Sequence, residues 1–416
     1  MNPRLIAALV LLFAAPVSAS VPDLFGYGAR ALGLAGAVAT APEGAAAVYY
    51  GPAALAFETR PSVALGFQRA DFLLSLDGTD YAVEPATATT IGLVLPLGFG
   101  GILAERLVLG CGFVIPTDAV LVATLPAAPT PRFSLVESRA QTVTLQAALG
   151  LRLHPRLAVG AGIIALSALD GAIDVAPNQE GRIGSTARSQ LVASYATVLS
   201  ALIQWPGDVA SSVTYRGESA ARFSLPLQAD LGERFPLPLP ELVVRGVAQY
   251  DPAQLDGELS AEPVAGLRVA LGATWKAWSA YPIPLVYPAV PEAFPPQPPP
   301  NFVDTVELRV GGEGTWGRFT PRLGYRLIPS PAPEQTGPRN DLDNVRHLLA
   351  AGLGLRWAEV HVDLGVQWHH LVARAHVKSA ASIEAAGFPA DDHPGSPGIE
   401  HGGDVFVVGL EVGAAL

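Results

Sequence analysis

Apolar and polar residues alternate with a period of two in segment after segment of this chain, and this pattern constrains the fold most. In residues 359–369 one face is wholly apolar, and the other face carries polar or small side chains. Successive side chains of a strand point to opposite faces, so each such segment is predicted to be a β-strand with one apolar face. The clearest apolar faces are Val360, Val362, Leu364, Val366 and Trp368; Val143, Leu145, Ala147, Leu149, Leu151 and Leu153; Leu267, Val269, Leu271, Ala273 and Trp275; and Phe406, Val408, Leu410, Val412, Ala414 and Leu416.

The composition places these apolar faces toward lipid. Apolar residues make up 50 % of the 416 residues and charged residues only 15 %, against about 25 % charged residues in a soluble domain. After residue 20 no stretch has the roughly 18 consecutive apolar residues that a membrane helix needs. We therefore predict a transmembrane β-barrel with a polar inner face and an apolar outer face. An Ala/Gly-rich soluble sandwich or solenoid is the alternative.

The connections between the predicted strands alternate between short and long. Outer-membrane barrels have short periplasmic turns and long outer loops, so we expect a bacterial outer-membrane protein. An even number of strands then puts both termini in the periplasm. Residues 252–265 form one link on the short side that is too long for this rule. The fourteen predicted antiparallel strands lie near 61–70, 88–98, 106–115, 138–153, 157–175, 189–205, 208–217, 241–251, 266–278, 304–316, 319–329, 346–357, 359–377 and 404–416.

Charge and cysteine content exclude several classes of function. The net charge is −11 without a basic run, so nucleic acid is not an expected partner. Cys111 is the single cysteine, which rules out an internal disulfide. Serine and histidine occur without a recognisable catalytic pairing, so we expect no enzyme and no cofactor.

The chain divides into three parts by its local sequence. Residues 1–19 have the form of a secretory signal peptide, with Arg4, an apolar core LIAALVLLFAA and the small-residue cleavage site Val17-Ser18-Ala19. An uncleaved anchor is the alternative, but the apolar run is too short to span a membrane. Residues 20–58 are rich in Gly and Ala and precede the first strand. Residues 59–416 are predicted to form the barrel.

The Gly- and Ala-rich part carries a family resemblance. Residues 28–33 read GARALG, and residues 47–55 read AVYYGPAAL. These sequences resemble the N-terminal hatch of the FadL/TodX-type family, which comprises outer-membrane transport proteins for long-chain fatty acids and hydrophobic compounds. Gly51 stands where that family usually has Asn, and Ala54 where it has Gly. We expect the turn before Pro52 to survive, since Gly and Asn both tolerate a left-handed backbone.

The same resemblance returns in the C-terminal third. Residues 303–316 and 319–357 resemble two of the family's strand motifs, including its R-x-G-Y and P-S-P-x-P runs. The resemblance implies a barrel closed by a hatch, with passive, gated uptake through a capture groove among the outer loops and a lateral exit. The matching residues include Arg322, Gly324, Tyr325, Pro329, Pro331, Pro333, Asp343, Arg346, His347, Gly352, Gly354 and Arg356.

The candidate site residues in the hatch have two interpretations. Aromatic residues there line or gate the ligand path, or they pack a plug against the wall. Arg30 anchors the hatch to a lumen carboxylate such as Glu411 or Asp363, or it contacts an anionic head group. The candidates are Phe25, Tyr27, Arg30, Tyr49, Tyr50, Gly51, Pro52 and Ala53.

Further candidates lie outside the hatch. Arg346 and His347 begin a strand beside the outer loops, and form a loop salt bridge with Asp343 or part of a ligand entrance. The apolar loop 121–133 fits a capture groove, and Gly110 and Gly112 fit a bulge or kink near a lateral opening. A late group of histidines and acids was considered for a divalent ion, but we predict no metal site. Its members are His361, His369, His370, His376, His393, His401, Asp391, Asp392, Glu400 and Asp404.

Two functions follow as hypotheses. The first is a transporter of long-chain fatty acids or other small hydrophobic molecules, monomeric and surrounded by outer-membrane lipid and lipopolysaccharide. The second is a structural or adhesion barrel, or a polar-solute channel, on the same scaffold, because a fold does not fix a function.

Overall fold

The computed structural model of the protein describes residues 21–100, 105–117, 129–136, 143–177, 183–229, 242–283, 285–286 and 299–416. The predicted signal peptide, residues 1–19, lies outside the described residues. Within these ranges, no helix combines the length and the apolar character needed to cross a membrane. The helices are α2 (Val21–Phe25), α3 (Ala29–Gly33), α4 (Ala46–Tyr50) and α5 (Ala380–Ala385), with the 3₁₀ helices η1 (Pro52–Phe57) and η3 (Trp278–Ala280).

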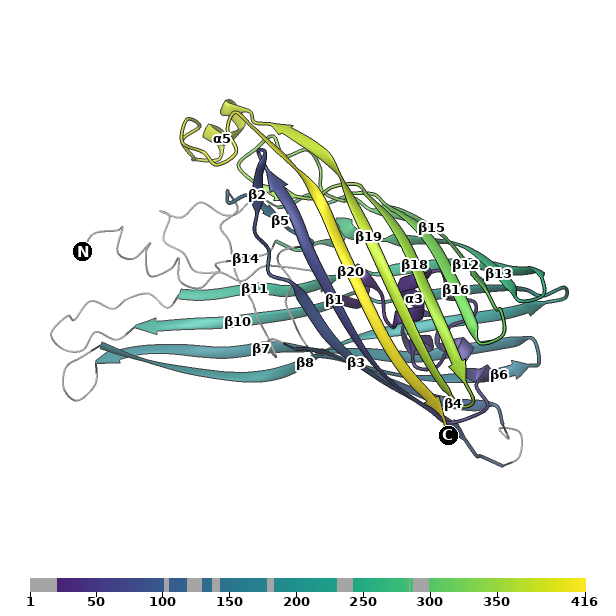
Figure 1. The fold of residues 1–416 in the computed structure, drawn as a ribbon. Helices are drawn as coiled ribbons and strands as arrows, with labels where there is room; N and C mark the ends of the chain where they lie inside the picture. Colours follow the sequence, from purple (N-terminus) through teal and green to yellow (C-terminus); the bar gives the residue numbers. More distant parts are fainter. Residues whose placement is uncertain are drawn as a thin grey trace.

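Fourteen antiparallel strands close into a ring, which confirms the predicted barrel (Figure 1). The last strand pairs with the first from Ser62↔Ala415 to Leu76↔His401, so this ring has no unpaired edge strand. Of the 18 strands in the sheet, β2, β10, β11 and β14 are outside the ring. In ring order, the strands are β1 (Ser62–Leu76), β3 (Ala86–Leu97), β4 (Leu107–Pro116), β6 (Thr144–His154), β7 (Leu157–Pro177), β8 (Ile183–Trp205), β9 (Val209–Arg216), β12 (Gln254–Val264), β13 (Leu267–Lys276), β15 (Thr305–Gly314), β16 (Phe319–Ile328), β18 (Arg346–Trp357), β19 (Val360–Val377) and β20 (Gly398–Ala415).

The wall has the polar inside and apolar outside of a membrane barrel. On β12, for example, Leu259 is 52 % exposed on the outer face, whereas its neighbour Glu258 is 4 % exposed on the inner face. A soluble barrel would bury its apolar face instead. The exposed leucines and valines of the wall are therefore stable only against lipid.

Exposed aromatic residues mark the two edges of this apolar band. Trp205 and Trp357 lie on the outer face at the short-turn ends of β8 and β18. Tyr195 lies on the same outer face of β8, ten residues from Trp205, and is 65 % exposed. Ten residues at about 3.3 Å each, on a strand tilted by about 40°, span roughly 25 Å, the usual height of the band. β8 is 23 residues long, so part of it extends beyond the band.

One predicted link is a wall strand. Residues 252–265 were expected to be a connection, but Gln254–Val264 form β12, which pairs with both β9 and β13. Leu255 and Leu259 alternate with Asp256 and Glu258, and the two acids face the lumen. Acidic residues are more common in loops than in strands, so this stretch resembled a loop although it alternates with a period of two.

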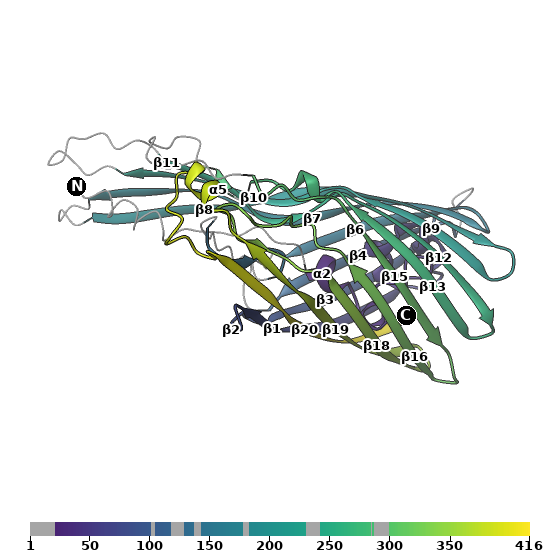
Figure 2. The ribbon, with the colours of Figure 1, turned by 90° about the horizontal axis from the view of Figure 1, so that it is seen from above.

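The predicted strand 241–251 exists, but it is not part of the ring. It corresponds to β11 (Leu242–Asp251), which pairs antiparallel with β10 (Ser219–Ala229), a strand between two of the predicted ones. β10 also pairs in parallel with the outer half of β7. Figure 2 shows this strand pair extending beside β7 and β8 beyond the barrel. The remaining short strands are β2 (Thr79–Tyr81), β5 (Arg132–Phe133), β14 (Leu285–Val286) and β17 (Asp341–Leu342).

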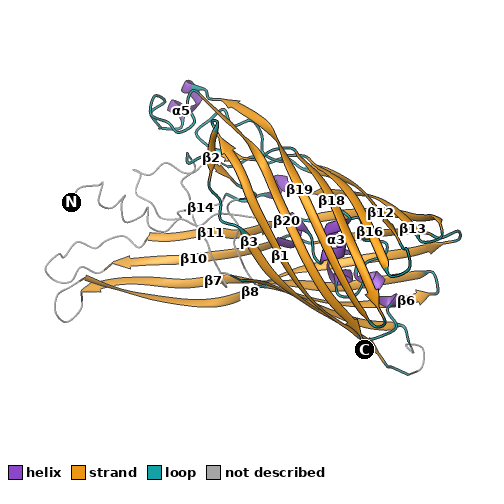
Figure 3. Cartoon of the chain, viewed as in Figure 1, coloured by secondary structure: helices purple, strands orange, loops and turns teal. Residues whose placement is uncertain are grey.

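Residues 21–57, here called the inner segment, lie inside the ring (Figure 3). Helix α3 packs against β16, β18, β19 and β20, whereas η1 packs against β4, β6, β7 and β8 on the other wall. Nearly every residue of the segment is buried. The segment therefore crosses the lumen between opposite walls.

Glycines on the inner wall make room for the inner segment. A Cβ on Gly160 would lie 2.3 Å from the backbone N of Ala53, and a Cβ on Gly365 would lie 2.3 Å from the backbone O of Ala29. Neither approach is compatible with a side chain, so these positions allow backbone-to-backbone packing.

The expected bulge on β4 is absent from the structure. β4 pairs with β3 and with β6 in unbroken register. A Cβ on Gly110 would meet Val48 at 2.6 Å, and one on Gly112 would meet the Tyr27 hydroxyl at 2.8 Å. These two glycines thus accommodate the inner segment rather than a kink.

Candidate functional site

The Gly51-Pro52-Ala53 step fastens the inner segment to β8 and β9. The Ala53 N–H donates to Ser200 Oγ at 2.6 Å, and Thr214 Oγ1 donates to the Tyr50 carbonyl at 3.0 Å. Pro52 begins η1, where a missing N–H has no cost. Gly51 has an extended φ of 177°, as the residue before a proline usually does, so the step does not use the left-handed conformation that glycine tolerates.

The candidate aromatic residues are buried against one another. Tyr27 stacks on Tyr49 at a ring distance of 6.4 Å, and Tyr49 meets Tyr50 edge-on at 5.0 Å. The Tyr50 hydroxyl accepts the backbone N–H of Tyr27, and the Tyr27 hydroxyl donates to the Ile91 carbonyl of β3. In this conformation the three tyrosines pack the inner segment to itself and to the wall.

Arg30 pairs with a carboxylate that the sequence analysis did not name. Its guanidinium donates to both carboxylate oxygens of Glu313 on β15, with Nε to Oε2 at 3.1 Å, and its Nη1 donates to the Ala41 carbonyl at 2.7 Å. The expected ion pairs with Glu411 or Asp363 are therefore wrong. Asp363 accepts instead from Arg322, which also lies 3.2 Å from Glu313.

A second set of polar contacts joins the inner segment to β12 and β13, whose charged residues pair in turn with residues of β15. Asp23 accepts from Lys276 Nζ at 2.6 Å, and Glu258 accepts from the Thr40 backbone N–H at 3.0 Å. Burial favours the neutral form of the Asp23 carboxyl, but Lys276, Arg216 and Gln254 together outweigh burial and lower the pKa of this carboxyl to about 2.

Sequence reasoning missed the wall residues of this set. All six lie on the inner faces of strands with alternating sequences, so the period of two was the available signal. For two of them, the strand itself was taken for a link. The missed residues are Asp256, Glu258, Lys276, Glu307, Arg309 and Glu313.

Arg346 and His347 lie on opposite faces of β18, so the structure separates these two candidates. Arg346 faces the lumen and is 6 % exposed. Among the described residues its guanidinium has no ion pair, and its Nε is buried without a hydrogen-bond partner. His347 faces outward, where its Nδ1 lies 2.8 Å from the Tyr325 hydroxyl. The predicted salt bridge between Asp343 and Arg346 is not among the ion pairs of the described residues, and burial raises the pKa of Asp343 although Arg346 opposes this.

The cross-strand neighbours of Arg346 are apolar. Its partners across the two neighbouring strands are Ile328 and Leu371, both buried. His369 lies one inward-facing position closer to the inner segment and meets the Phe25 ring at 5.8 Å. Arg346 thus stands directly above the inner segment, on the side of the long loops.

An aromatic cluster lies at the long-loop end of the barrel. Tyr281 stacks on Phe302 at 4.4 Å and meets Tyr250 edge-on at 5.5 Å, with Trp278 beside them. The Tyr250 hydroxyl is buried without a hydrogen-bond partner among the described residues. The cluster is continuous with the apolar side chains of the inner segment, including Phe25.

The predicted capture loop is described only at its end. Residues 121–128 lie outside the described residues, while Phe133 is buried and belongs to β5, which pairs with β17. Arg132 binds Asp341 at 2.7 Å. Burial favours neutral Asp341, but Arg132 and Arg339 outweigh it and lower the pKa of that carboxyl to about 2. These contacts fix the end of this loop against the loop after β16.

The late histidines do not gather at the outer loops. His376 and His401 stack at 5.1 Å in the loop region, whereas His370 lies on the outer wall beside Asp404. His361 lies far from them at the other end of β19. The cluster considered from the sequence is therefore dispersed.

Comparisons with known proteins find the same fold. The chain matches a Pseudomonas aeruginosa FadL homologue at 15 % identity with a TM-score of 0.63, covering 93 % of this chain and 98 % of that one. It matches the P. putida toluene transporter TodX at 14 % identity with a TM-score of 0.61, over 95 % and 99 %. The CymD monoaromatic hydrocarbon channel matches at 14 % identity with a TM-score of 0.54, over 98 % of both chains. No family model and no curated protein sequence matches.

Proposed function

We propose that this chain is a member of the FadL/TodX-type outer-membrane proteins and lets small hydrophobic molecules cross by passive, gated diffusion. The shared fold supports this proposal. The compounds in the names of the similar proteins, toluene and monoaromatic hydrocarbons, also support it. In the proposed arrangement residues 1–19 are a signal peptide, 20–58 a hatch and 59–416 the barrel of a monomer. The short turns and both termini face the periplasm, and outer-membrane lipid and lipopolysaccharide surround the wall.

The position of the inner segment is the observation that carries the proposal. It crosses the lumen, and three cavities that adjoin it in the described part of the chain measure about 20–30 Å³ each. Such spaces hold one or two waters each. A polar-solute channel needs a continuous aqueous lumen, so a closed lumen below an apolar cluster favours a passage for hydrophobic molecules.

Arg346 favours a ligand with an anionic head, as in a long-chain fatty acid. A buried guanidinium without a partner is costly, and a carboxylate supplies two acceptors for it. The apolar side chains around it, Ile328 and Leu371, suit the adjoining alkyl chain. In this arrangement the carboxylate binds at Arg346 while the chain lies toward Phe25 and the aromatic cluster.

Uptake of labelled oleate tests this assignment. Cells without their own outer-membrane fatty acid transporter would express the wild type, Arg346→Gln, or His347→Gln. A charge-assisted hydrogen bond contributes about 1.5–3 kcal/mol, so we expect Arg346→Gln to lower oleate uptake at low concentration by about tenfold or more. His347→Gln is the matched control, because His347 is the chain neighbour of Arg346 but lies on the outer face of β18.

Toluene uptake by the same cells distinguishes a loss of head-group binding from a block of the whole transport path. Toluene has no carboxylate, so its uptake should be equal in all three proteins. If Arg346→Gln lowered the uptake of oleate and of toluene equally, the head-group role of Arg346 would be contradicted. No uptake of either compound by a folded wild-type barrel would argue against transport itself and favour a structural barrel.

A further inference from the structure

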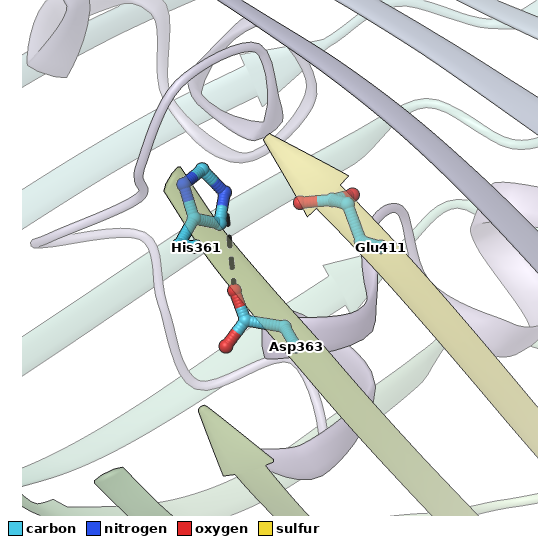
Figure 4. Close-up of side chains that lie close together, drawn as sticks. All are labelled: His361, Asp363 and Glu411. Atoms are coloured by element: carbon cyan, nitrogen blue, oxygen red, sulfur yellow. Dashed lines mark ion pairs between the residues drawn. The ribbon is translucent and has the colours of Figure 1, made fainter. Parts of the chain in front are cut away.

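Three side chains with metal-binding donor atoms meet near the short-turn end of the lumen. His361 and Asp363 lie two residues apart on the inner face of β19, and Glu411 faces them from β20 (Figure 4). Asp363 is paired directly with Glu411 in the sheet register. One donor atom from each residue lies within 4.8 Å of the others.

The backbone of β20 is shaped to hold the imidazole in this place. His361 pairs across the strands with Gly413, and a Cβ on Gly413 would lie 2.3 Å from the imidazole Cε1. Only glycine therefore lets the ring lie over β20 beside Glu411. Because residues 361 and 363 point to the same face of a strand, the imidazole and the Asp363 carboxylate converge on one space.

The two carboxylates face each other with free acceptor capacity. Arg322 donates to Oδ1 of Asp363, and the other oxygen, Oδ2, lies 4.0 Å from His361 Nε2. Among the described residues, Glu411 has no ion pair, and the backbone N–H of Ala29 donates to it. Like charges directly opposite in a sheet repel. A cation between them would remove this repulsion.

A cavity of about 30 Å³ adjoins all three residues. That space suffices for an ion and one or two waters. Arg30 also borders this cavity, but its guanidinium is bound to Glu313 and the Ala41 carbonyl. Its charge is thus balanced outside the space between the two carboxylates.

We propose that His361, Asp363 and Glu411 bind a divalent first-row metal ion such as Zn²⁺. One imidazole nitrogen with two carboxylate oxygens is a donor set for Zn²⁺ or its neighbours, whereas Mg²⁺ and Ca²⁺ prefer oxygen alone. Ligands at about 2.0–2.2 Å from a tetrahedral ion lie about 3.5 Å apart, so the side chains close by about 1 Å on binding. Waters complete the coordination.

The bound ion would tie the closing seam of the barrel to the inner segment. Glu411 touches the start of α3, where a Cβ on Gly28 would lie 3.0 Å from its Oε2. An ion that fixes Glu411 therefore also fixes the residues that begin α3. This role is separate from the hydrophobic path and does not depend on it.

Zinc binding by the purified protein tests the site. The full barrel, prepared in detergent without a polyhistidine tag, would be titrated calorimetrically with Zn²⁺ as wild type, His361→Ala and Glu411→Gln. We expect one equivalent for the wild type and at least tenfold weaker binding for both variants. His154→Ala is the matched control, since this exposed histidine ends β6 beside a short turn at the same end of the barrel. It should bind like the wild type.

Two results would overturn the proposal. One is a wild type that takes up no Zn²⁺, and the other is unchanged affinity in His361→Ala and Glu411→Gln. If His361→Ala does not give a heat-modifiable barrel, His361→Gln keeps most of the side-chain volume. Its Co²⁺ absorption should then lack the ligand-field bands of the wild type. Retained bands in His361→Gln would contradict the assignment.

Discussion

At the scale of single residues, Glu313 is the centre of the contacts between the inner segment and the wall. Its carboxylate receives Arg30 from the inner segment and Arg322 from the next strand, and Arg268 Nη1 lies 3.5 Å away. A buried ion pair does not by itself stabilise a fold, since desolvation offsets the attraction. Removal of one partner is different, because it leaves buried charges without compensation.

Glu313→Gln should lower the free energy of unfolding by about 3–5 kcal/mol, because the three guanidiniums around residue 313 would lose the carboxylate that they share. Urea unfolding in lipid vesicles measures this. Glu359→Gln is the control: Glu359 pairs with Arg60 at 2.8 Å, but both side chains are at least 60 % exposed, and an exposed pair contributes about 1 kcal/mol or less. Equal effects of the two substitutions would show that the Glu313 contacts do not hold the segment.

At the scale of elements, the strands were easier to predict than the side-chain contacts between distant elements. Alternation is a local property, so β19 and β20 are evident from the sequence, and β12 was missed only because its inner face carries Asp256 and Glu258. The pairing of Arg30 with Glu313 joins residues 283 positions apart. No local pattern encodes such a contact, which is why Glu411 and Asp363 were named instead.

The packing of η1 against β7 gives a prediction at this scale. Gly160→Ala would place a methyl group 2.3 Å from Ala53 N, which displaces the step at Pro52 and breaks the hydrogen bond to Ser200. We expect hydrogen exchange of the amides in residues 51–57 to become at least tenfold faster, by mass spectrometry on the folded barrel. Gly257→Ala is the matched control.

The control substitution lies on the outer face of β12, where a Cβ on Gly257 would meet no atom within 4 Å. It changes the same residue type in a wall strand without touching the inner segment. Unchanged protection of residues 51–57 in Gly160→Ala would mean that the close approach of β7 does not hold η1 in place.

At the scale of the whole molecule, the chain is a barrel whose lumen is filled by its own N-terminal residues. The ring of fourteen strands follows from alternation and from the need to leave no edge in lipid. The place of residues 21–57 inside the ring does not follow from either, since it depends on how Gly160, Gly365 and the inner-face charges fit their backbone. The resemblance predicts a hatch, whereas the contacts of these residues with the wall are visible only in the structure. We propose that residues 21–57 thereby close the lumen.

Ion conductance in a planar lipid bilayer tests this closure most directly. The wild type and a variant without residues 21–57 would be reconstituted as folded, heat-modifiable barrels in the same lipid. We expect no steady conductance from the wild type and a steady open current from the deletion variant, because the inner segment is the part of the described chain that crosses the lumen. A conducting wild type, or a deletion variant that stays closed, would contradict the claim that residues 21–57 close the barrel.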